Sequence, residues 1–430
     1  MPFFLRLDHD CYTKNIRNIR NINMNVRIDP SMLHGTIRAI ASKSQAHRML
    51  ICAAFADRPT RIICRERSND IDATAECLRA IGCDIVYDEA DGSFYVTPAA
   101  KINKNAVIDC GESGSTLRFL LPVVCALGIE CTIVMHGRLP ERPLSPLWEE
   151  LEAHGCTLKR NPDRTISTSG SLRGGAFTLA ADISSQFISG LLFAMPLIKE
   201  ASSLRLTGQI ESRNYIMMTM DALKAFGAVT EWNSDTLTAS NGTGYHSPGE
   251  VTVEGDWSNG AFWLCASALT NGAVQCTGLD ESSRQGDKAV TKLIELISRG
   301  NAAVDARDVP DLVPVLSVLA AAIPGTTSFV HAERLRIKES DRIKTTIAML
   351  RSLGAECSDT SDGLTVTGGK RLSGGSVDSF NDHRIAMSAA VASIMCDGAV
   401  EISGAEAVKK SYPDFWRDFA RLGGQVTVTE

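Results

Sequence analysis

Hydrophobic and polar positions follow a unit along this chain that recurs six times. Each unit closes with an amphipathic segment that runs into a glycine, at Gly82, Gly155, Gly227, Gly300, Gly354 and Gly423. A glycine just beyond a helix adopts the left-handed conformation that other residues avoid, so each one predicts a helix terminus. The glycines are separated by 73, 72, 73, 54 and 69 residues, and this near-regular spacing predicts internal duplication.

Most of these glycines are followed by a segment that alternates between apolar and polar residues, which predicts a β-hairpin. The predicted hairpins cover residues 85–97, 157–168, 229–239 and 356–367. A unit of strands and helices predicts an α/β fold, and six units divide naturally into two similar domains of three. We expect a discontinuous first domain, residues 24–41 plus 251–430, and a second domain, residues 42–250.

The starts of six predicted helices carry small hydroxyls, amides or charged groups. They are Ser42-Lys43-Ser44-Gln45, residues 111–116, Ser184-Ser185-Gln186, Asp311, residues 338–342 and residues 381–384. Taken singly, each is as typical of a simple helix cap as of a binding site. A helix N-terminus with free amides and nearby lysine or arginine binds anions, so the set as a whole predicts sites for phosphates or carboxylates.

Two short polar segments near the C-terminal end are the most informative. They are Lys338-Glu339-Ser340-Asp341-Arg342 and Asn381-Asp382-His383-Arg384, and each directly precedes an apolar helical pattern. Anion binding alone does not require Glu339 among these cations, so we interpret it as a group for proton transfer beside a bound phosphate or carboxylate. His383 taken alone is more typical of a hydrogen-bonded structural histidine, and Tyr215 alone of a core residue.

Composition and charge restrict the classes of function. The chain has 430 residues, 44% hydrophobic and 22% charged, which is ordinary globular composition and enough for two domains. A net charge of −6 does not favour a nucleic-acid partner, and no apolar run is long enough to span a bilayer. Thirteen cysteines without a CxxC motif suggest no zinc site or redox pair and fit a reducing cytoplasm. We interpret residues 1–23 as a disordered extension, with Met24 as an alternative start.

Taken together and in order, these motifs resemble those of the 5-enolpyruvylshikimate-3-phosphate synthase (EPSP synthase) family. The resemblance runs from about residue 26 to the end. It rests on Ser42-Lys43-Ser44 with Arg48, Gly114-Ser115-Thr116 with Arg118, Glu141-Arg142-Pro143, Ser184-Ser185-Gln186, Ser212 with Tyr215, Asp311, the two polar segments, and Lys410 before Tyr412-Pro413. It implies two domains, each of three βαβαββ-type units, which close on substrate at an active site in the cleft between them.

The same resemblance implies a reaction. The enolpyruvyl group of phosphoenolpyruvate moves to the 5-hydroxyl of shikimate 3-phosphate through a tetrahedral intermediate, and phosphate is released. Asp311 is implied as the base for the hydroxyl and Glu339 as the acid for the alkene carbon, with Lys43 as the rival acid. An acid needs a raised pKa, whereas the cations beside Glu339 would lower it, and the sequence leaves this conflict open.

The resemblance also assigns residues to each substrate. Those for phosphoenolpyruvate are Lys43, Gly114, Arg142, Gln186, Arg342, Arg384 and Lys410. Those for shikimate 3-phosphate are Lys43, Ser44, Arg48, Ser184, Ser185, Ser212, Tyr215, Asp311 and Lys338. Arginine suits phosphates and carboxylates because its planar fork donates two parallel hydrogen bonds.

Two positions depart from the family pattern. Glu112 stands where many members have asparagine, and it would repel phosphoenolpyruvate unless it turns away or pairs with a cation. Arg334 stands where some members have an asparagine that contacts the shikimate phosphate, and a cation can serve there too. Gly114 follows the family pattern, from which we expect ordinary sensitivity to glyphosate.

Two other functions remain as alternatives. UDP-N-acetylglucosamine enolpyruvyl transferase has the same architecture and donor, but it carries a reactive cysteine on a loop that here, at residues 136–142, has none. A non-catalytic anion-binding protein on this scaffold has no use for Asp311 and Glu339 beside anions. No metal or organic cofactor, nucleic acid or membrane partner is implied, and a cytoplasmic monomer is expected.

Overall fold

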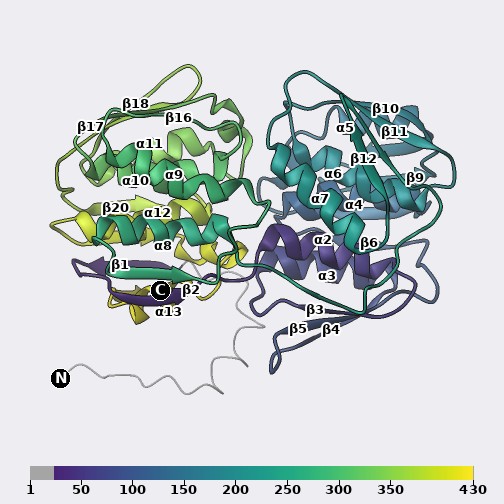
Figure 1. Cartoon of the computed structure of the whole chain (residues 1–430), viewed down its shortest axis with the longest axis horizontal. Helices are drawn as coiled ribbons and strands as arrows, with labels where there is room; N and C mark the ends of the chain where they lie inside the picture. The colour runs from purple at the N-terminus through teal and green to yellow at the C-terminus, as the bar shows by residue number, and fades with distance from the viewer. Residues whose placement is uncertain (1–23, 430) are drawn as a thin grey trace.

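The computed structural model describes residues 24–429, which form two lobes that lie side by side (Figure 1). Lobe 1 has a hydrophobic core of buried residues from Val26 to Ile40 and from Trp257 to Leu422. Lobe 2 has a separate core that runs from Ala41 to Val253. The predicted domain division stays a prediction, which the change of core at these points supports. The proposed extension, residues 1–23, lies outside the described part, and the alternative start at Met24 stays a prediction.

Lobe 2 contains three four-stranded sheets, each with a parallel pair followed by a hairpin. The strands of the first sheet are, in order, β14 (Glu250–Thr252), β3 (Thr60–Ile63), β5 (Ser93–Thr97) and β4 (Asp84–Asp88). Those of the second are β6 (Val107–Asp109), β7 (Cys131–Val134), β9 (Ile166–Gly170) and β8 (Cys156–Arg160). Those of the third are β10 (Gly175–Ala180), β11 (Ser202–Thr207), β13 (Thr236–Ala239) and β12 (Thr230–Asn233). The α-helices of lobe 2 are α2 (Lys43–Ala54), α3 (Asn69–Ile81), α4 (Gly114–Ala126), α5 (Leu147–Ala153), α6 (Ser185–Ala194) and α7 (Arg213–Ala225).

Lobe 1 repeats this plan in two sheets and shortens it in a third. The strands of the first sheet are, in order, β16 (Ala303–Asp305), β17 (Gly325–Val330), β19 (Leu364–Gly368) and β18 (Glu356–Asp359). Those of the second are β20 (Gly375–Asp378), β21 (Val400–Ser403), β1 (Asn25–Asp29) and β22 (Gln425–Thr429). The shortened sheet contains only β15 (Val274–Thr277) and β2 (Gly35–Arg38). The α-helices of lobe 1 are α8 (Trp257–Leu269), α9 (Val290–Ser298), α10 (Val313–Ala322), α11 (Arg342–Ser352), α12 (His383–Ala392) and α13 (Phe415–Arg421).

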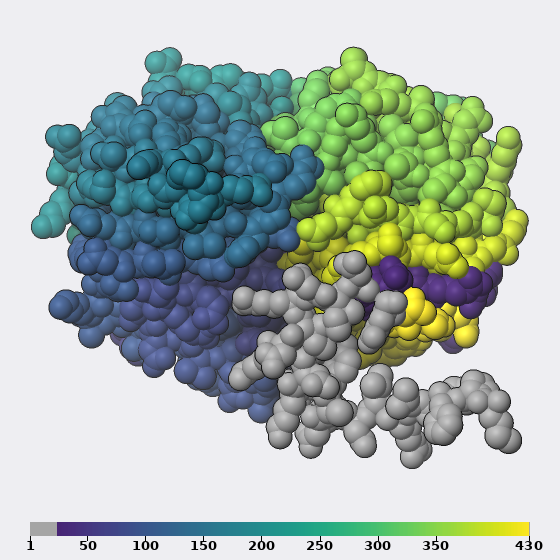
Figure 2. Space-filling view, turned by 180° about the vertical axis from the view of Figure 1, so that it is seen from behind, coloured from purple at the N-terminus to yellow at the C-terminus, as the bar shows by residue number. Residues whose placement is uncertain are grey.

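The two ends of the described chain meet in one sheet of lobe 1. Strand β1 pairs antiparallel with both β21 and β22, so the N-terminal strand completes a unit built from the C-terminal residues. From behind, the purple start of the chain lies among yellow C-terminal residues (Figure 2). This closure leaves β1 in the place that a hairpin strand takes in the other four-stranded units.

The predicted repeat is confirmed by the backbone. All six helix-end glycines have positive φ, from 75° at Gly300 to 119° at Gly82. The four predicted hairpins form as β4–β5, β8–β9, β12–β13 and β18–β19. The unit that ends at Gly300 has only the two-stranded sheet and no hairpin, which explains the short interval of 54 residues in the sequence. The α/β fold of six units is therefore confirmed, with one unit shorter than predicted.

The chain crosses between the lobes twice, and the two crossings lie against each other. Ala41 and Gly255 form an antiparallel bridge, Ser42 N donates to Glu254 O at 2.8 Å, and Asp256 N donates to Ile40 O at 2.8 Å. Immediately after the crossings come the first residues of α2 and α8. The paired crossings thus bring the N-termini of one helix from each lobe to the same place. No helix within residues 24–429 is long and apolar enough to cross a membrane.

Candidate active site

A cavity between the lobes is lined by the first residues of helices from both sides. Fifteen of the sixteen residues assigned from the sequence line it: Lys43, Ser44, Arg48, Gly114, Arg142, Ser184, Ser185, Gln186, Ser212, Tyr215, Asp311, Lys338, Glu339, Arg342 and Arg384. Lys410 is the exception. Segments up to about 340 residues apart in sequence therefore meet at one site, although their assigned roles stay predictions.

Helix capping places many of these side chains as the sequence predicts. Ser42, Ser113 and Ser184 accept hydrogen bonds from backbone amides at the starts of α2, α4 and α6. Asp341 and Asp382 do the same for α11 and α12. Each cap fixes where its helix begins, and the residues next to the cap then face the cavity with the positive end of the helix dipole behind them.

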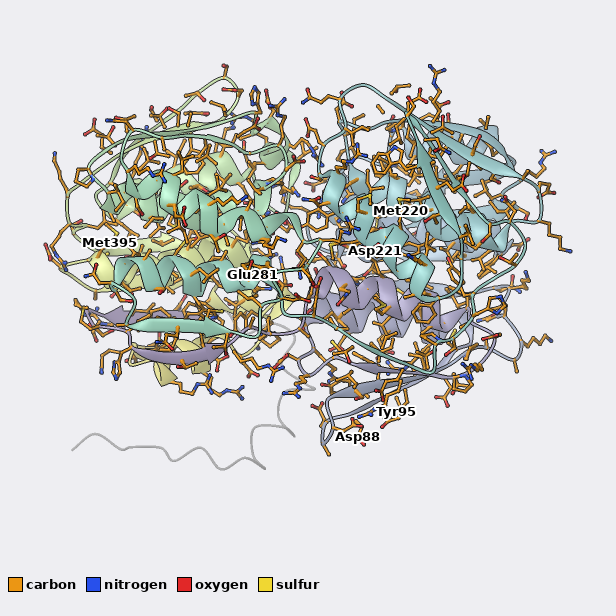
Figure 3. The ribbon with its side chains drawn as sticks, viewed as in Figure 1. Asp88, Tyr95, Met220, Asp221, Glu281 and Met395 are labelled. Atoms are coloured by element: carbon orange, nitrogen blue, oxygen red, sulfur yellow. The ribbon has the colours of Figure 1, made fainter. Side chains whose placement is uncertain are left out.

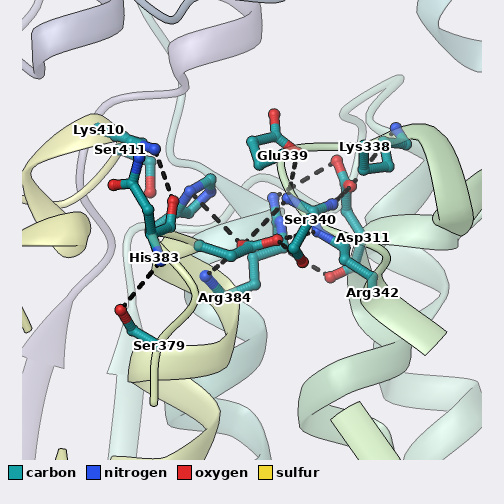
Figure 4. A network of polar contacts seen from close by, with 12 residues as sticks. Asp311, Lys338, Glu339, Ser340, Arg342, Ser379, His383, Arg384, Lys410 and Ser411 are labelled. Carbon is teal, nitrogen blue, oxygen red and sulfur yellow. Dashed lines mark hydrogen bonds and ion pairs between the residues drawn. The ribbon is translucent and has the colours of Figure 1, made fainter. Parts of the chain in front are cut away.

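Arg342 is the centre of the polar network at the cavity floor (Figure 4). Its guanidinium is buried and donates through Nη1 to Asp311 Oδ1 at 2.5 Å and through Nη2 to Glu339 Oε2 at 2.6 Å. Its Nε donates to Asp382 Oδ2 at 2.8 Å, and Ser340 Oγ donates to the same oxygen at 2.9 Å. One arginine thus bridges both carboxylates assigned to proton transfer, while Asp382 and Ser340 hold its orientation.

Asp311 stands among three cations. Besides Arg342, Arg384 Nη2 lies 3.5 Å from Oδ2 and Lys338 Nζ lies 3.7 Å from Oδ1. Burial alone would raise the pKa of Asp311, but Arg384, Lys338 and Arg342 together outweigh it and hold the pKa well below its usual range. Asp311 is therefore ionised and in the correct state to accept a proton.

Glu339 is also surrounded by cations, and these oppose its assigned role as a proton donor. Arg142 Nη1 reaches across from lobe 2 to lie 3.5 Å from Glu339 Oε1. Burial raises the pKa of Glu339, but Arg342 and Arg142 outweigh it, so the pKa lies well below its usual range. The conflict anticipated from the sequence is present here: Glu339 is ionised in this arrangement.

The two lysines of the cavity differ in pKa. Burial lowers the pKa of Lys43, but Asp70, whose Oδ2 accepts from Lys43 Nζ at 2.9 Å, outweighs burial and raises it. The pKa of Lys338 falls to about 8, because burial outweighs the attraction of Asp311. Lys43 is thus a firmly protonated cation and a poor proton donor in this arrangement, whereas Lys338 titrates just above neutral pH.

Arg48 forms part of the cavity wall. Its three donating nitrogens are engaged by Thr219 Oγ1 at 2.9 Å, Ser44 O at 2.6 Å and Tyr215 O at 2.9 Å. Burial lowers the pKa of Arg48 to about 10. These contacts tie α2 to α7, so Arg48 positions two of the assigned residues, Ser44 and Tyr215.

Arg118 lines the cavity but was quoted only as part of a motif, without an assigned role. It is 4% exposed; Nη1 donates to Gln186 Oε1 at 2.8 Å and Nη2 to Pro143 O at 3.3 Å. Its position one turn after Gly114, on an otherwise apolar helix, was the signal in the sequence. Asp70, Asp256 and Ser258 also line the cavity, and no sequence motif marked them.

Several buried polar atoms of the cavity have no protein partner. Within residues 24–429 these include Nε of Arg118, Arg142 and Arg384 and both ring nitrogens of His383. Buried polar groups are normally hydrogen-bonded, so unpaired nitrogens concentrated at one site indicate a place for a ligand that accepts hydrogen bonds. Among the same residues, no group of three or more His, Cys, Asp or Glu side chains is placed to hold a metal ion.

Both departures from the family pattern form ion pairs between the lobes. Lys410 Nζ of lobe 1 donates to Glu112 Oε2 of lobe 2 at 2.7 Å, so Glu112 pairs with a cation. Arg334 Nη1 donates to Glu211 Oε2 at 2.6 Å. Arg284 Nε of lobe 1 also donates to Asp221 Oδ2 of α7 at 3.0 Å. Asp221 is labelled in Figure 3. Together with Arg142 and Glu339, these pairs hold the lobes together around the cavity.

Comparison with known proteins identifies this architecture. A family model described as EPSP synthase (3-phosphoshikimate 1-carboxyvinyltransferase) matches residues 28–419. The chain belongs to the EPSP synthase family. The 3-phosphoshikimate 1-carboxyvinyltransferase of Clostridium kluyveri is 37% identical over 93% of this chain and 98% of that protein. That of Clostridium perfringens is 40% identical with the same coverage. The family resemblance drawn from the motifs is confirmed.

Solved structures of EPSP synthase family architecture share the fold. EPSP synthase from Acinetobacter baumannii has a TM-score of 0.78 at 22% identity and covers 95% of this chain and 100% of its own. The enolpyruvyl transferase NikO from Streptomyces tendae has a TM-score of 0.76 at 19% identity and covers 95% of this chain and 99% of its own. At such identities the likeness shows the fold alone.

Proposed function

We infer that this chain transfers the enolpyruvyl group of phosphoenolpyruvate to the 5-hydroxyl of shikimate 3-phosphate and releases phosphate. The observation that carries this inference is the bridge from Arg342 to Asp311 and Glu339, in a cavity lined by the cations and hydroxyls assigned to both substrates. Family membership supplies the substrates, since the reaction is named in the family's description. The monomeric state, the cytoplasmic location and the domain division stay predictions from the sequence.

The arrangement suggests how substrate binding starts the chemistry. Arg142, Arg342 and Arg384 suit the phosphate and carboxylate of phosphoenolpyruvate, but each now contacts Asp311 or Glu339. When the substrate takes these guanidinium groups, both carboxylates lose part of their compensating charge and their pKa values rise. Asp311 then becomes a stronger base for the 5-hydroxyl, and Glu339 can carry the proton that the methylene carbon needs.

The remaining steps follow from these two groups. Protonation of the methylene carbon makes the neighbouring carbon electrophilic, and the 5-hydroxyl oxygen attacks it as Asp311 takes the proton. The resulting tetrahedral intermediate collapses by loss of phosphate and of a methyl proton, which the Glu339 carboxylate takes back, and this step restores the carbon–carbon double bond and forms the enol ether. Lys338 and Arg334 both line the cavity, and we expect them to hold the shikimate phosphate.

The test is release of phosphate from phosphoenolpyruvate with either shikimate 3-phosphate or UDP-N-acetylglucosamine as acceptor. Release with shikimate 3-phosphate alone supports the proposal. Release with the sugar nucleotide alone would overturn the choice of acceptor. The cysteine nearest in sequence to residues 136–142 is Cys131, which is buried in β7. No release with either would favour the anion-binding alternative.

Asp311→Asn separates catalysis from binding. Because the amide keeps the shape but cannot accept the proton, we expect kcat to fall by about 10²- to 10⁴-fold, while calorimetry still detects shikimate 3-phosphate. Asp305→Asn is the matched control, since Asp305 is an exposed carboxylate in the preceding strand. Turnover retained by Asp311→Asn would remove Asp311 as the base.

A further inference from the structure

Glu112 lies in the loop between β6 and α4 and reaches into lobe 1. Its Oε2 accepts from Lys410 Nζ at 2.7 Å, and Asn381 Nδ2 donates to both of its carboxylate oxygens, at 3.0 and 3.2 Å. Lys410 Nζ also donates to Asn381 O at 2.6 Å. The contact therefore joins residues 298 positions apart, one from each lobe.

This pair removes Lys410 from the cavity. The other cations assigned to phosphoenolpyruvate, such as Arg142 and Arg384, line the cavity, whereas Lys410 does not. Its side chain is only 11% exposed and its ammonium group is occupied by a protein carboxylate. A cation assigned to a substrate anion is thus already neutralised by the protein.

The position of the Glu112 carboxylate is shaped by the backbone behind it. Gly137 packs against this carboxylate in the left-handed region, at φ +54°. A Cβ on Gly137 would lie 2.6 Å from both Cδ and Oε2 of Glu112, so a side chain there would displace the carboxylate from this position. The carboxylate is therefore seated between Gly137 on one side and Lys410 with Asn381 on the other.

We propose that Glu112 occupies Lys410 and Asn381 in place of the phosphoenolpyruvate anion and so sets the affinity for that substrate. The proposal rests on the function inferred above. Phosphoenolpyruvate must take Lys410 from Glu112 and must also bind near an additional negative charge. Glu112 is a positioning residue in this account, because it acts through Lys410 and touches no reacting atom.

The competition for Lys410 and the negative charge of Glu112 both weaken the binding of phosphoenolpyruvate in this account. Glu112→Gln removes the competing charge and the repulsion but keeps the shape of the side chain. We expect the KM for phosphoenolpyruvate to fall about fivefold, with kcat and the KM for shikimate 3-phosphate nearly unchanged. The difference from the wild type should shrink as salt is added, because the interaction lies close to solvent.

A matched control removes the same charge elsewhere. Glu130 is exposed beyond the C-terminal end of α4, whereas Glu112 lies just before its start. Glu130→Gln should leave the KM for phosphoenolpyruvate unchanged. Lys410→Gln provides the second arm: in that background, the effect of Glu112→Gln should be smaller than fivefold, because the competition for Lys410 no longer exists and only the repulsion remains.

Two readouts keep this inference separate from the proposed function. Phosphate release gives KM and kcat, and calorimetric titration of phosphoenolpyruvate without shikimate 3-phosphate gives affinity without turnover. A wild-type protein that releases no phosphate would overturn the proposed function, while the titration would still test Glu112. Equal or weaker phosphoenolpyruvate binding by Glu112→Gln, or an undiminished effect in the Lys410→Gln background, would overturn the proposal.

Discussion

Arg342 Nη2 lies 2.6 Å from Glu339 Oε2, and this contact holds the proposed acid in its ionised form. The guanidinium that binds Glu339 is also one that the substrate anion would use. Binding and proton transfer are thus coupled through one side chain: a substrate that takes Arg342 changes the pKa of Glu339 at the same time. The ionised Glu339 of this arrangement is therefore compatible with an acid that gains its proton as the substrate arrives.

This contact predicts a pH dependence of stability. The folded-state pKa of Glu339 lies well below its ordinary value of 4.5, so its stabilising contribution is complete above that pH and is lost as pH falls through the folded pKa. We expect Glu339→Gln to weaken the dependence of the free energy of unfolding on pH below about 4.5, measured by urea denaturation. The exposed Glu141→Gln should keep the wild-type dependence. Parallel curves for wild type and Glu339→Gln would contradict the depressed pKa.

Lys338 predicts a pH dependence of substrate capture. Its pKa is lowered to about 8, so the ammonium form that binds a phosphate is lost as pH rises through that value. We expect kcat/KM for shikimate 3-phosphate to fall above pH 8, since this ratio reports the free enzyme. Lys338→Arg should move the fall to higher pH, because a guanidinium stays charged. A wild-type profile that is flat through this range would show that Lys338 stays protonated.

Local signals in the sequence were sufficient for much of this fold. A glycine at the end of a helix predicts by itself that the backbone there has a positive φ, and Gly82 and Gly354 have this conformation. Caps such as Asp341 and Asp382 likewise act within one turn of their helices. Such features depend on a few neighbouring residues, so they can be read without knowledge of the rest of the chain.

Contacts that depend on tertiary structure could not be read in this way. The insertion of β1 between β21 and β22 joins opposite ends of the chain, and nothing local in β1 specifies its partners. For Glu112 the sequence left two alternatives, turning away or pairing with a cation, because its partner is 298 residues distant. The motif placed Lys410 with the substrate cations, but its position outside the cavity depends on how the two lobes meet.

The cavity position of Arg334, which pairs with Glu211 across the lobes, predicts that its loss affects one substrate more than the other. It lines the cavity, and Nη1 lies 2.6 Å from Glu211 Oε2 and 3.4 Å from Ser212 Oγ. We expect Arg334→Ala to raise the KM for shikimate 3-phosphate by about tenfold, the loss of one charge-assisted contact, with a smaller effect on phosphoenolpyruvate. The control is Arg205→Ala, which breaks an exposed pair with Asp235 on the same protein.

One outcome for Arg334→Ala would contradict a role in binding the shikimate phosphate. If Arg334 only held the lobes together, its loss would raise the KM of both substrates by similar factors, because closure serves both. A selective effect on shikimate 3-phosphate is therefore the result that identifies Arg334 as a ligand of its phosphate. Initial rates with each substrate varied in turn distinguish the two.

The position of Gly114 predicts that Gly114→Ala weakens activity without lowering stability. It is the first residue of α4 and its φ is not in the left-handed region, so the backbone itself accepts alanine. A Cβ there, however, would lie 2.7 Å from Nη1 of both Arg118 and Arg142. Those atoms end flexible side chains and can move, but only by leaving the positions from which we propose that Arg142 binds the substrate. We expect Gly114→Ala to raise the KM for phosphoenolpyruvate by about tenfold through loss of aligned charge-assisted hydrogen bonds.

Stability should not follow activity in this variant. Alanine favours a helix more than glycine does, by up to about 1 kcal/mol in a helix interior and less at its first residue. Thermal unfolding of Gly114→Ala should therefore occur at or above the wild-type Tm, and the KM for shikimate 3-phosphate should change little. A lowered Tm would mean that the two arginines cannot move aside, whereas an unchanged KM for phosphoenolpyruvate would mean that Arg142 reaches its substrate from a different position.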